Sequence, residues 1–203
     1  MKKISLFRLR FLLVAAIAFS VLYSCKKSDN GGGPSNTNTS GYSVSFKANG
    51  VQIKYTSETF ATVAYTATNK LYTAILEGYH DYNTAGEDHI AILLYDSNPI
   101  TTSTYQDPQK AVGANGNKVP QVLINYYKDA SNNYISMGLF VDENGVPAAG
   151  TEAAVADAKV TITKLTSSSV EGTFSGTVFL SSDPSFQKKV VITDGKFTLK
   201  RLQ

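Results

Sequence analysis

The fold is decided by residues 42–55, which read YSVSFKANGVQIKY. Apolar and polar side chains alternate before Asn49-Gly50, and they alternate again after it. Alternation with a period of two residues predicts strands that bury one face. Asn-Gly between two such runs predicts a type I′ turn, because that turn needs positive φ at both central residues. We therefore expect an antiparallel β-hairpin at the start of the folded domain.

The same alternation recurs along the rest of the chain. Most of these segments come in pairs that flank a polar turn, as in hairpins. The expected strands are residues 71–79 and 89–95, 119–127 and 134–141, 159–165 and 170–180, and 189–199. One segment, the alanine-rich 148–158, is compatible with a short helix. The sequence therefore predicts an all-β fold: a single antiparallel β-sandwich or barrel-like domain of about 9–11 strands, mostly connected by hairpins.

The first forty residues have a different composition. Four basic residues among the first ten are followed by the apolar run 11–22 and then by Ser24-Cys25. This order predicts a secretory signal peptide over residues 1–24, since the run is shorter than the ~20 residues of a membrane span. Residues 28–40 contain no large apolar side chain, which predicts a flexible tether. The expected organisation is a signal peptide (1–24), a lipidated cysteine with its tether (25–41) and an all-β domain (42–203).

The cleavage region resembles a known processing motif. Residues 22–25 read Leu-Tyr-Ser-Cys, which resembles the lipobox of bacterial lipoproteins. The resemblance implies that Cys25 is acylated and anchors the protein in the lipid bilayer. Cys25 is also the only cysteine, so no disulfide can form within one chain. The alternative is an ordinary secretory signal with an incidental cysteine.

Three stretches of the domain resemble one family. They are residues 46–51 (FKANGV), 170–176 (VEGTFSG) and 192–197 (ITDGKF). Together they resemble a family of Bacteroidetes lipoproteins of unknown function, over roughly residues 44–203. The resemblance implies an all-β fold and a place in the cell envelope, on the outer membrane and either periplasmic or surface-exposed. It implies no reaction and no catalytic residue.

The charge balance limits the possible partners. Without residues 1–24, the chain has 15 Lys and Arg against 16 Asp and Glu, and it contains no long basic run. The electrostatic basis for binding nucleic acid is therefore missing. Besides the bilayer, the expected partners are a glycan or another envelope protein.

Catalytic motifs are scarce. The domain lacks cysteine and tryptophan, has two histidines, and contains neither Gly-x-Ser-x-Gly nor a glycine-rich phosphate loop. We therefore predict no catalytic residue and no cofactor, and favour a non-enzymatic binding module. The alternative is a glycan-directed hydrolase whose acids are brought together only by the fold. Glu77, Asp96 and Glu171 are the acids nearest to predicted strand interiors or ends.

One polar loop carries candidate metal ligands. The residues around it are His80, Asp81, Glu87, Asp88 and His89, whose imidazoles and carboxylates suit zinc or another divalent ion. The competing interpretation is a solvated turn that collects charged residues.

Two tyrosines in long polar segments are candidate ligand anchors. Tyr82 lies in the loop 80–88 and Tyr105 in the segment 96–118, whose length is typical of functional loops. A tyrosine ring offers a flat apolar face with a hydroxyl, which suits a sugar or a protein partner. Because the two loops leave opposite ends of the predicted 71–79/89–95 hairpin, the longer one would have to fold back to join the first.

Overall fold

The structure is a computed structural model that describes residues 41–81, 88–107, 110–142, 144, 146–147, 151 and 155–203. Asn38–Gln203 form one compact unit. Its described residues contain thirteen strands and two 3₁₀ turns, which confirms the predicted all-β fold. Within the described residues, no helix has the length and apolar character needed to cross a bilayer. The predicted signal peptide, the lipobox and Cys25 lie outside the described residues.

The elements follow one another in chain order from the N-terminal hairpin to a long final strand. They are β1 (Ser43–Ala48), β2 (Val51–Tyr55), β3 (Glu58–Thr66), β4 (Leu71–Tyr79), β5 (His89–Asp96), β6 (Thr104–Gln106), β7 (Lys110–Val112), η1 (Ala114–Gly116), β8 (Lys118–Pro120), β9 (Val122–Asp129), β10 (Asn132–Ser136), η2 (Gly138–Phe140), β11 (Lys159–Leu165), β12 (Ser169–Leu180) and β13 (Lys189–Leu202).

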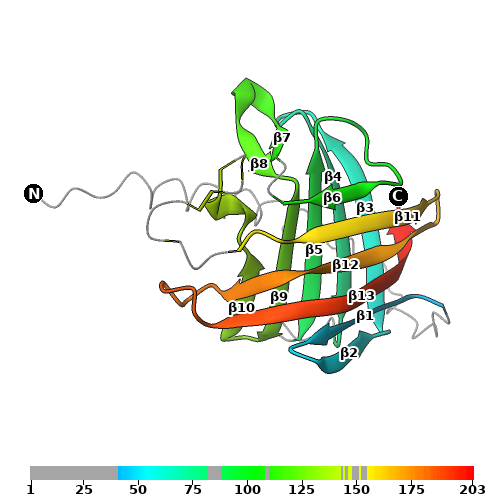
Figure 1. The fold of residues 1–203 in the computed structure, drawn as a ribbon. Coiled ribbons are helices and arrows are strands. Elements are labelled where there is room, and N and C mark those ends of the chain that lie inside the picture. The colour runs from blue at the N-terminus through cyan, green and yellow to red at the C-terminus, as the bar shows by residue number, and fades with distance from the viewer. Residues whose placement is uncertain are drawn as a thin grey trace, which may run out of the picture. The chain divides into compact units, whose positions relative to one another are not determined.

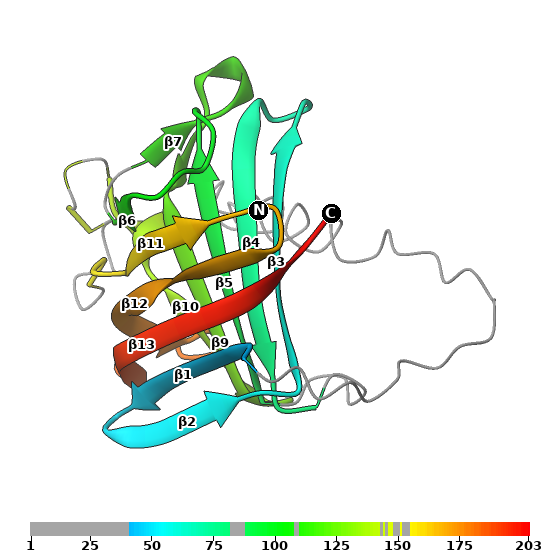
Figure 2. The ribbon, with the colours of Figure 1, turned by 90° about the vertical axis from the view of Figure 1, so that its right-hand side faces the viewer.

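The strands form two layers. The front layer has the order β2-β1-β13-β12-β11-β6, and the back layer has the order β3-β4-β5-β9-β10. In Figure 1 the front strands run across the back strands, and Figure 2 shows the two layers facing each other. The layers join at two places, where β13 pairs with β3 and where β10 pairs with β12. Seven strands thereby close into a ring, so the domain is a flattened barrel whose β1–β2 and β11–β6 pairs extend the front layer.

The N-terminal hairpin forms as predicted. Asn49 and Gly50 have φ values of 49° and 83°, the positive values that a type I′ turn requires. Ala48 pairs with Val51 across the turn. The predicted hairpins β4–β5, β9–β10 and β11–β12 are also antiparallel pairs.

Several predicted boundaries are wrong. β3 was not expected, and two short strands, β6 and β7, lie in the segment predicted to be a loop. The predicted strand 119–127 is divided between β8 and β9. The predicted strand 134–141 stops at Ser136 and continues as the turn η2. In the predicted helix 148–158, Thr151 and residues 155–158 are not helical, and the remaining positions lie outside the described residues.

The core lies between the layers and is centred on Phe46. Its ring is fully buried and lies 5.5–5.9 Å, centroid to centroid, from the rings of Tyr55, Tyr126 and Phe174. Gly172 leaves room for Phe197, because a Cβ there would lie 2.5 Å from that ring. The two layers are therefore in close contact, and binding surfaces have to be sought on their outer faces.

Candidate functional site

The outer face of the front layer is polar along its full width. One row of neighbouring residues crosses all six strands, and we call it the threonine row. In order from β6 to β2, its members are Thr104, Thr161, Thr173, Lys196, Ser45 and Lys54. The hydroxyls of Thr104 and Thr161 lie 3.0 Å apart and are hydrogen-bonded. This row presents four hydroxyl and two ammonium groups and no apolar side chain.

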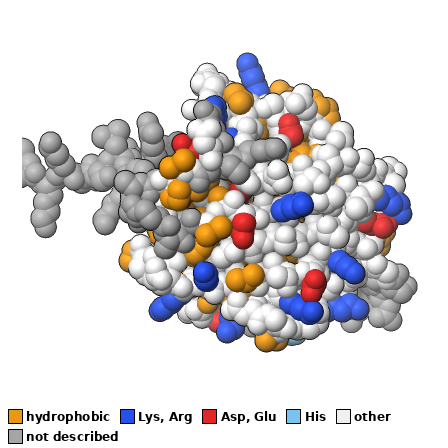
Figure 3. All heavy atoms as spheres, viewed as in Figure 1, with side chains coloured by type: hydrophobic (Ala, Val, Ile, Leu, Met, Phe, Trp, Pro, Cys, Tyr) orange, Lys and Arg blue, Asp and Glu red, His pale blue; other side chains and the backbone are white. Residues whose placement is uncertain are grey.

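A second row, the lysine row, runs beside the first. From β6 to β2 it consists of Gln106, Lys159, Ser175, Thr193 with Asp194, Lys47 and Gln52. Its single acid, Asp194, is 2.9 Å from the ammonium group of Lys47. The hydrogen bond and charge of Lys47 hold the pKa of Asp194 below its usual value. Two adjacent rows thus form a continuous polar surface, and Figure 3 shows basic side chains spread across this face of the molecule.

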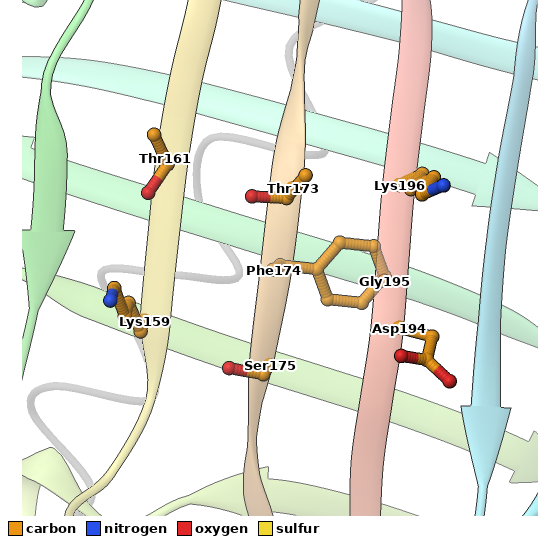
Figure 4. Close-up of a pocket in the computed structure, with 8 residues that line it drawn as sticks. All are labelled: Lys159, Thr161, Thr173, Phe174, Ser175, Asp194, Gly195 and Lys196. Atoms are coloured by element: carbon orange, nitrogen blue, oxygen red, sulfur yellow. The ribbon is translucent and has the colours of Figure 1, made fainter.

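A shallow hollow of about 360 Å³ lies where the two rows cross the middle strands. Figure 4 shows its walls, which come from three strands, and Phe174 directed toward Gly195. The lining residues are Lys159 and Thr161 on β11, Thr173, Phe174 and Ser175 on β12, and Asp194, Gly195 and Lys196 on β13. The hollow therefore combines hydroxyl, ammonium and carboxylate groups with a small apolar area.

A β-bulge in β13 shapes the hollow. The pairing with β12 shifts between Phe174 and Gly176, opposite Asp194, whose φ is 54°. The next residue has to be glycine, because a Cβ on Gly195 would lie 2.3 Å from the carbonyl oxygen of Phe174 and 2.7 Å from its ring. The bulge redirects the outward side chains of β13, as bulges near binding sites commonly do. The motif ITDGKF is thus a bulge within a strand.

The three acids considered for hydrolysis lie apart. Glu171 is on the front face and forms an ion pair of 2.6 Å with Lys164. Asp96, at the end of β5, accepts hydrogen bonds from the amide of Asn98 and the side chain of Gln121. Glu77 is on the outer face of the back layer. The structure therefore does not bring these three acids together into a catalytic pair.

Glu77 lies beside a row of stacked aromatic rings. The rings come from four neighbouring strands: Phe60, Tyr79, His89 and Tyr127. Their centroids are 6.1, 4.8 and 4.1 Å apart in turn, and the planes are within 18° of parallel. Glu77 is 6% exposed and accepts a hydrogen bond of 3.0 Å from the hydroxyl of Tyr79. Burial raises the pKa of its carboxyl, and the Tyr79 hydrogen bond opposes this rise.

A second buried carboxyl lies between β6 and β7. Asp107 is 7% exposed. Burial raises its pKa to about 7, the charge of Asp157 adds to the rise, and the Val122 amide and Lys110 oppose it. Asp157 itself is bound by the amide and hydroxyl of Thr177 at 2.6 and 2.8 Å. Sequence reasoning did not single out Asp107.

The predicted metal ligands that the structure describes do not form a cluster. Asp88 accepts a hydrogen bond of 2.5 Å from the buried hydroxyl of Tyr55, whereas His89 is stacked between Tyr79 and Tyr127 on the outer face. The Asp88 carboxylate thus points toward the buried Tyr55 hydroxyl and the His89 ring toward the outer face, so these two side chains diverge. No group of three or more His, Cys, Asp or Glu suited to a metal ion occurs in the described ranges.

The remaining members of that set give no ligand cluster either. His80 is connected to Asp88 through its backbone amide, which donates to the carbonyl oxygen of Asp88 at 3.0 Å. Asp81 follows it at the end of the described segment, and Glu87 lies outside the described residues.

The prediction that Tyr105 anchors a ligand is wrong. Tyr105 is 2% exposed and belongs to the core, where its ring fills the space beneath β6. Its hydroxyl accepts a hydrogen bond from the amide of Thr101 and donates one to the Thr101 carbonyl, at 2.8 and 3.1 Å. Tyr82 lies outside the described residues. The two loops also leave opposite ends of the β4–β5 hairpin, since Tyr79 pairs with His89 and Tyr72 with Asp96.

Known proteins offer no guide to this site, since no family model, no curated protein and no solved structure matches the chain. The hollow could not be found from the sequence because its members come from three strands. The available signal was the occurrence of Thr, Ser and Lys at alternate positions over residues 159–163, 173–177 and 196–200.

Proposed function

We propose that this protein is a cell-envelope lipoprotein, anchored through acylated Cys25, whose β domain binds a glycan without cleaving it. The observation that carries the proposal is the hollow in the front layer. The lipobox resemblance and the resemblance to Bacteroidetes lipoproteins support the location. The polar tether 28–40 would let the domain reach material beyond the bilayer surface.

The chemistry of the hollow fits a sugar. Thr161, Thr173 and Ser175 carry hydroxyls that both donate and accept hydrogen bonds, as sugar hydroxyls do. Lys159 and Lys196 add donors at the two rims. A volume of about 360 Å³ falls at the lower end of the ~300–1,000 Å³ range of ligand sites, which suits one or two sugar units of a longer chain.

The acids around the hollow support binding without cleavage. Glycoside hydrolysis needs two carboxyl groups on opposite sides of the scissile bond. Among the described residues that line the hollow, Asp194 is the single acid, and it is paired with Lys47. Glu77 and Asp107 are buried carboxyls with raised pKa values, as a proton donor needs, but neither lines the hollow.

A glycan array probed with the full-length protein in detergent tests the binding function. We expect a defined subset of glycans to bind, and Thr173→Val to weaken that binding about tenfold by removing a hydroxyl from the hollow. Thr73→Val is the matched control, because Thr73 lies on the outer face of the back layer. Capture of another envelope protein with no glycan bound, or equal binding by Thr173→Val and the parent, would contradict the proposal.

The anchor is tested separately. Cys25→Ser should move the protein from the membrane fraction to the soluble fraction, because it removes the acylated residue that holds the chain. Incorporation of labelled palmitate should be lost at the same time. Membrane retention with palmitate labelling in the Cys25→Ser protein would show that the anchor lies elsewhere.

A further inference from the structure

The two polar rows have a charge opposite to that of the domain as a whole. From Gly41 to Gln203 the sequence has thirteen Lys and Arg against fifteen Asp and Glu, a small negative excess. The rows contain four lysines and one acid. That acid, Asp194, is already neutralised by Lys47. Positive charge is therefore concentrated on one face of a slightly acidic domain.

Two of the lysines flank the hollow. Lys159 is on β11 and Lys196 on β13, at opposite rims in Figure 4, with the hydroxyls of Thr173 and Ser175 between them on β12. No ion pair joins either lysine to an acid of the described residues. Strands two positions apart are separated by ~10 Å, so the two ammonium groups can meet charges on successive units of a chain rather than a single ion.

We infer that the glycan bound in this hollow is anionic, with carboxylate, sulfate or phosphate groups that contact Lys159 and Lys196 while its hydroxyls contact Thr161, Thr173 and Ser175. The inference rests on the proposed function and specifies the substrate class of that site. The ligand lies across β11, β12 and β13, along the direction of the rows. The negative groups of the glycan are attracted to the lysines along both rows. Lys54 on β2 extends this positive surface to the edge of the sheet.

Anionic lipid headgroups could also supply negative groups to Lys159 and Lys196. The hydroxyls of the hollow favour a glycan over a headgroup layer. A headgroup layer needs only projecting ammonium groups, which Lys26 and Lys27 already provide beside the anchor. Such a layer would leave the hydroxyls between the two lysines without ligands. A flexible glycan chain can place charged groups at both rims and hydroxyls between them.

Binding of dextran, dextran sulfate and polygalacturonate to the full-length protein in detergent tests the inference. Dextran and dextran sulfate share a backbone and differ in charge. We expect both anionic polymers to bind at least tenfold more tightly than dextran, with an affinity that falls as salt is added. The double variant Lys159→Gln/Lys196→Gln should lose about tenfold in affinity for both and most of the salt dependence.

Matched controls and alternative outcomes separate this inference from the proposed function. Lys70→Gln/Lys128→Gln removes one lysine from the β3–β4 turn and one exposed lysine from β9, both outside the rows, and should bind like the parent. Equal binding of dextran and dextran sulfate, or an unchanged Lys159→Gln/Lys196→Gln variant, would overturn the anionic ligand and leave glycan binding intact. Competition by phosphatidylserine added to the micelles would assign the lysines to lipid. Failure of every glycan on the array would overturn the proposed function itself.

Discussion

The two layers of the barrel share one core but have outer faces of different chemistry. The front face carries hydroxyls and lysines in two continuous rows, whereas the back face carries four stacked rings and the buried carboxyl of Glu77. Both faces are built from strands with the same alternation of inward and outward residues. The difference shows that the inward positions determine the fold, while the outward positions are free to be used for other purposes.

The stacked rings also explain why the back face is the poorer sugar site. In the row Phe60, Tyr79, His89 and Tyr127, each inner ring has a neighbouring ring on both of its faces. A sugar stacks on a free aromatic face, and this row offers mainly ring edges. The back face is therefore tightly packed and contributes to stability, and the front face is the better candidate for binding.

The largest expected effect is a loss of stability when a side chain is added at Gly195, compared with a change of polarity at the neighbouring Thr193. Gly195→Val should lower the free energy of unfolding by about 3 kcal/mol, because the new side chain collides with the carbonyl oxygen and ring of Phe174. Thr193→Val, an exposed substitution at the same bulge, should change it by less than about 0.5 kcal/mol. Urea denaturation measures both. Equal stability of the two variants would show that the bulge tolerates a side chain at Gly195.

A smaller difference in stability is expected between one substitution on the back face and one on the front face. His89→Ala should lower the free energy of unfolding by about 1–2 kcal/mol, because it removes a ring stacked between Tyr79 and Tyr127. Thr173→Ala on the front face should cost less than about 0.5 kcal/mol. Thermal and urea unfolding of both proteins provide the measurement. A Thr173→Ala variant as unstable as His89→Ala would contradict a division between a structural and a binding face.

The smallest effect is a difference in pH dependence. Burial raises the pKa of Glu77 above its unfolded value of about 4.3, so the folded protein retains the proton at a higher pH than the unfolded chain does. The free energy of unfolding therefore falls as the pH rises from the unfolded pKa of Glu77 through its folded pKa. Lys47 lowers the pKa of Asp194, so the stability from that pair is lost as the pH falls below about 4. Urea titrations from pH 3 to 8 should show that Glu77→Gln reduces the first slope, to which Asp107 also contributes, and that Asp194→Asn reduces the second. Parallel curves for the two variants would refute the assignment.

Much of the fold could be predicted because its strands carry strong alternation. Residues 71–79 and 159–165 were predicted with the observed bounds of β4 and β11. β3 was missed because two of its inward residues, Thr59 and Ala61, are polar or small, so the period of two is weak. The strands of three residues, β6 to β8, are shorter than any window in which alternation can be recognised.

The site was less predictable because it depends on register. Thr161, Thr173 and Lys196 become neighbours only after β11, β12 and β13 are aligned. Tyr105 was mistaken for a ligand anchor because a lone tyrosine in a polar segment suggests an exposed ring. Its ring is instead the apolar group by which that segment is fixed to the core. Local composition therefore did not distinguish a tyrosine ring that binds a ligand from one that packs a loop against the core.

The pairing of β13 has a consequence for the order of folding. The last strand contacts the first strand through Ser43–Ala48, and its final residues, Lys200 to Leu202, form the parallel pairing with β3. The barrel therefore cannot close until the last residues of the chain are available. Contacts between distant parts of a sequence form slowly, typically in milliseconds to seconds. Until residues 200–202 pair with β3, the ring of strands is open along this seam.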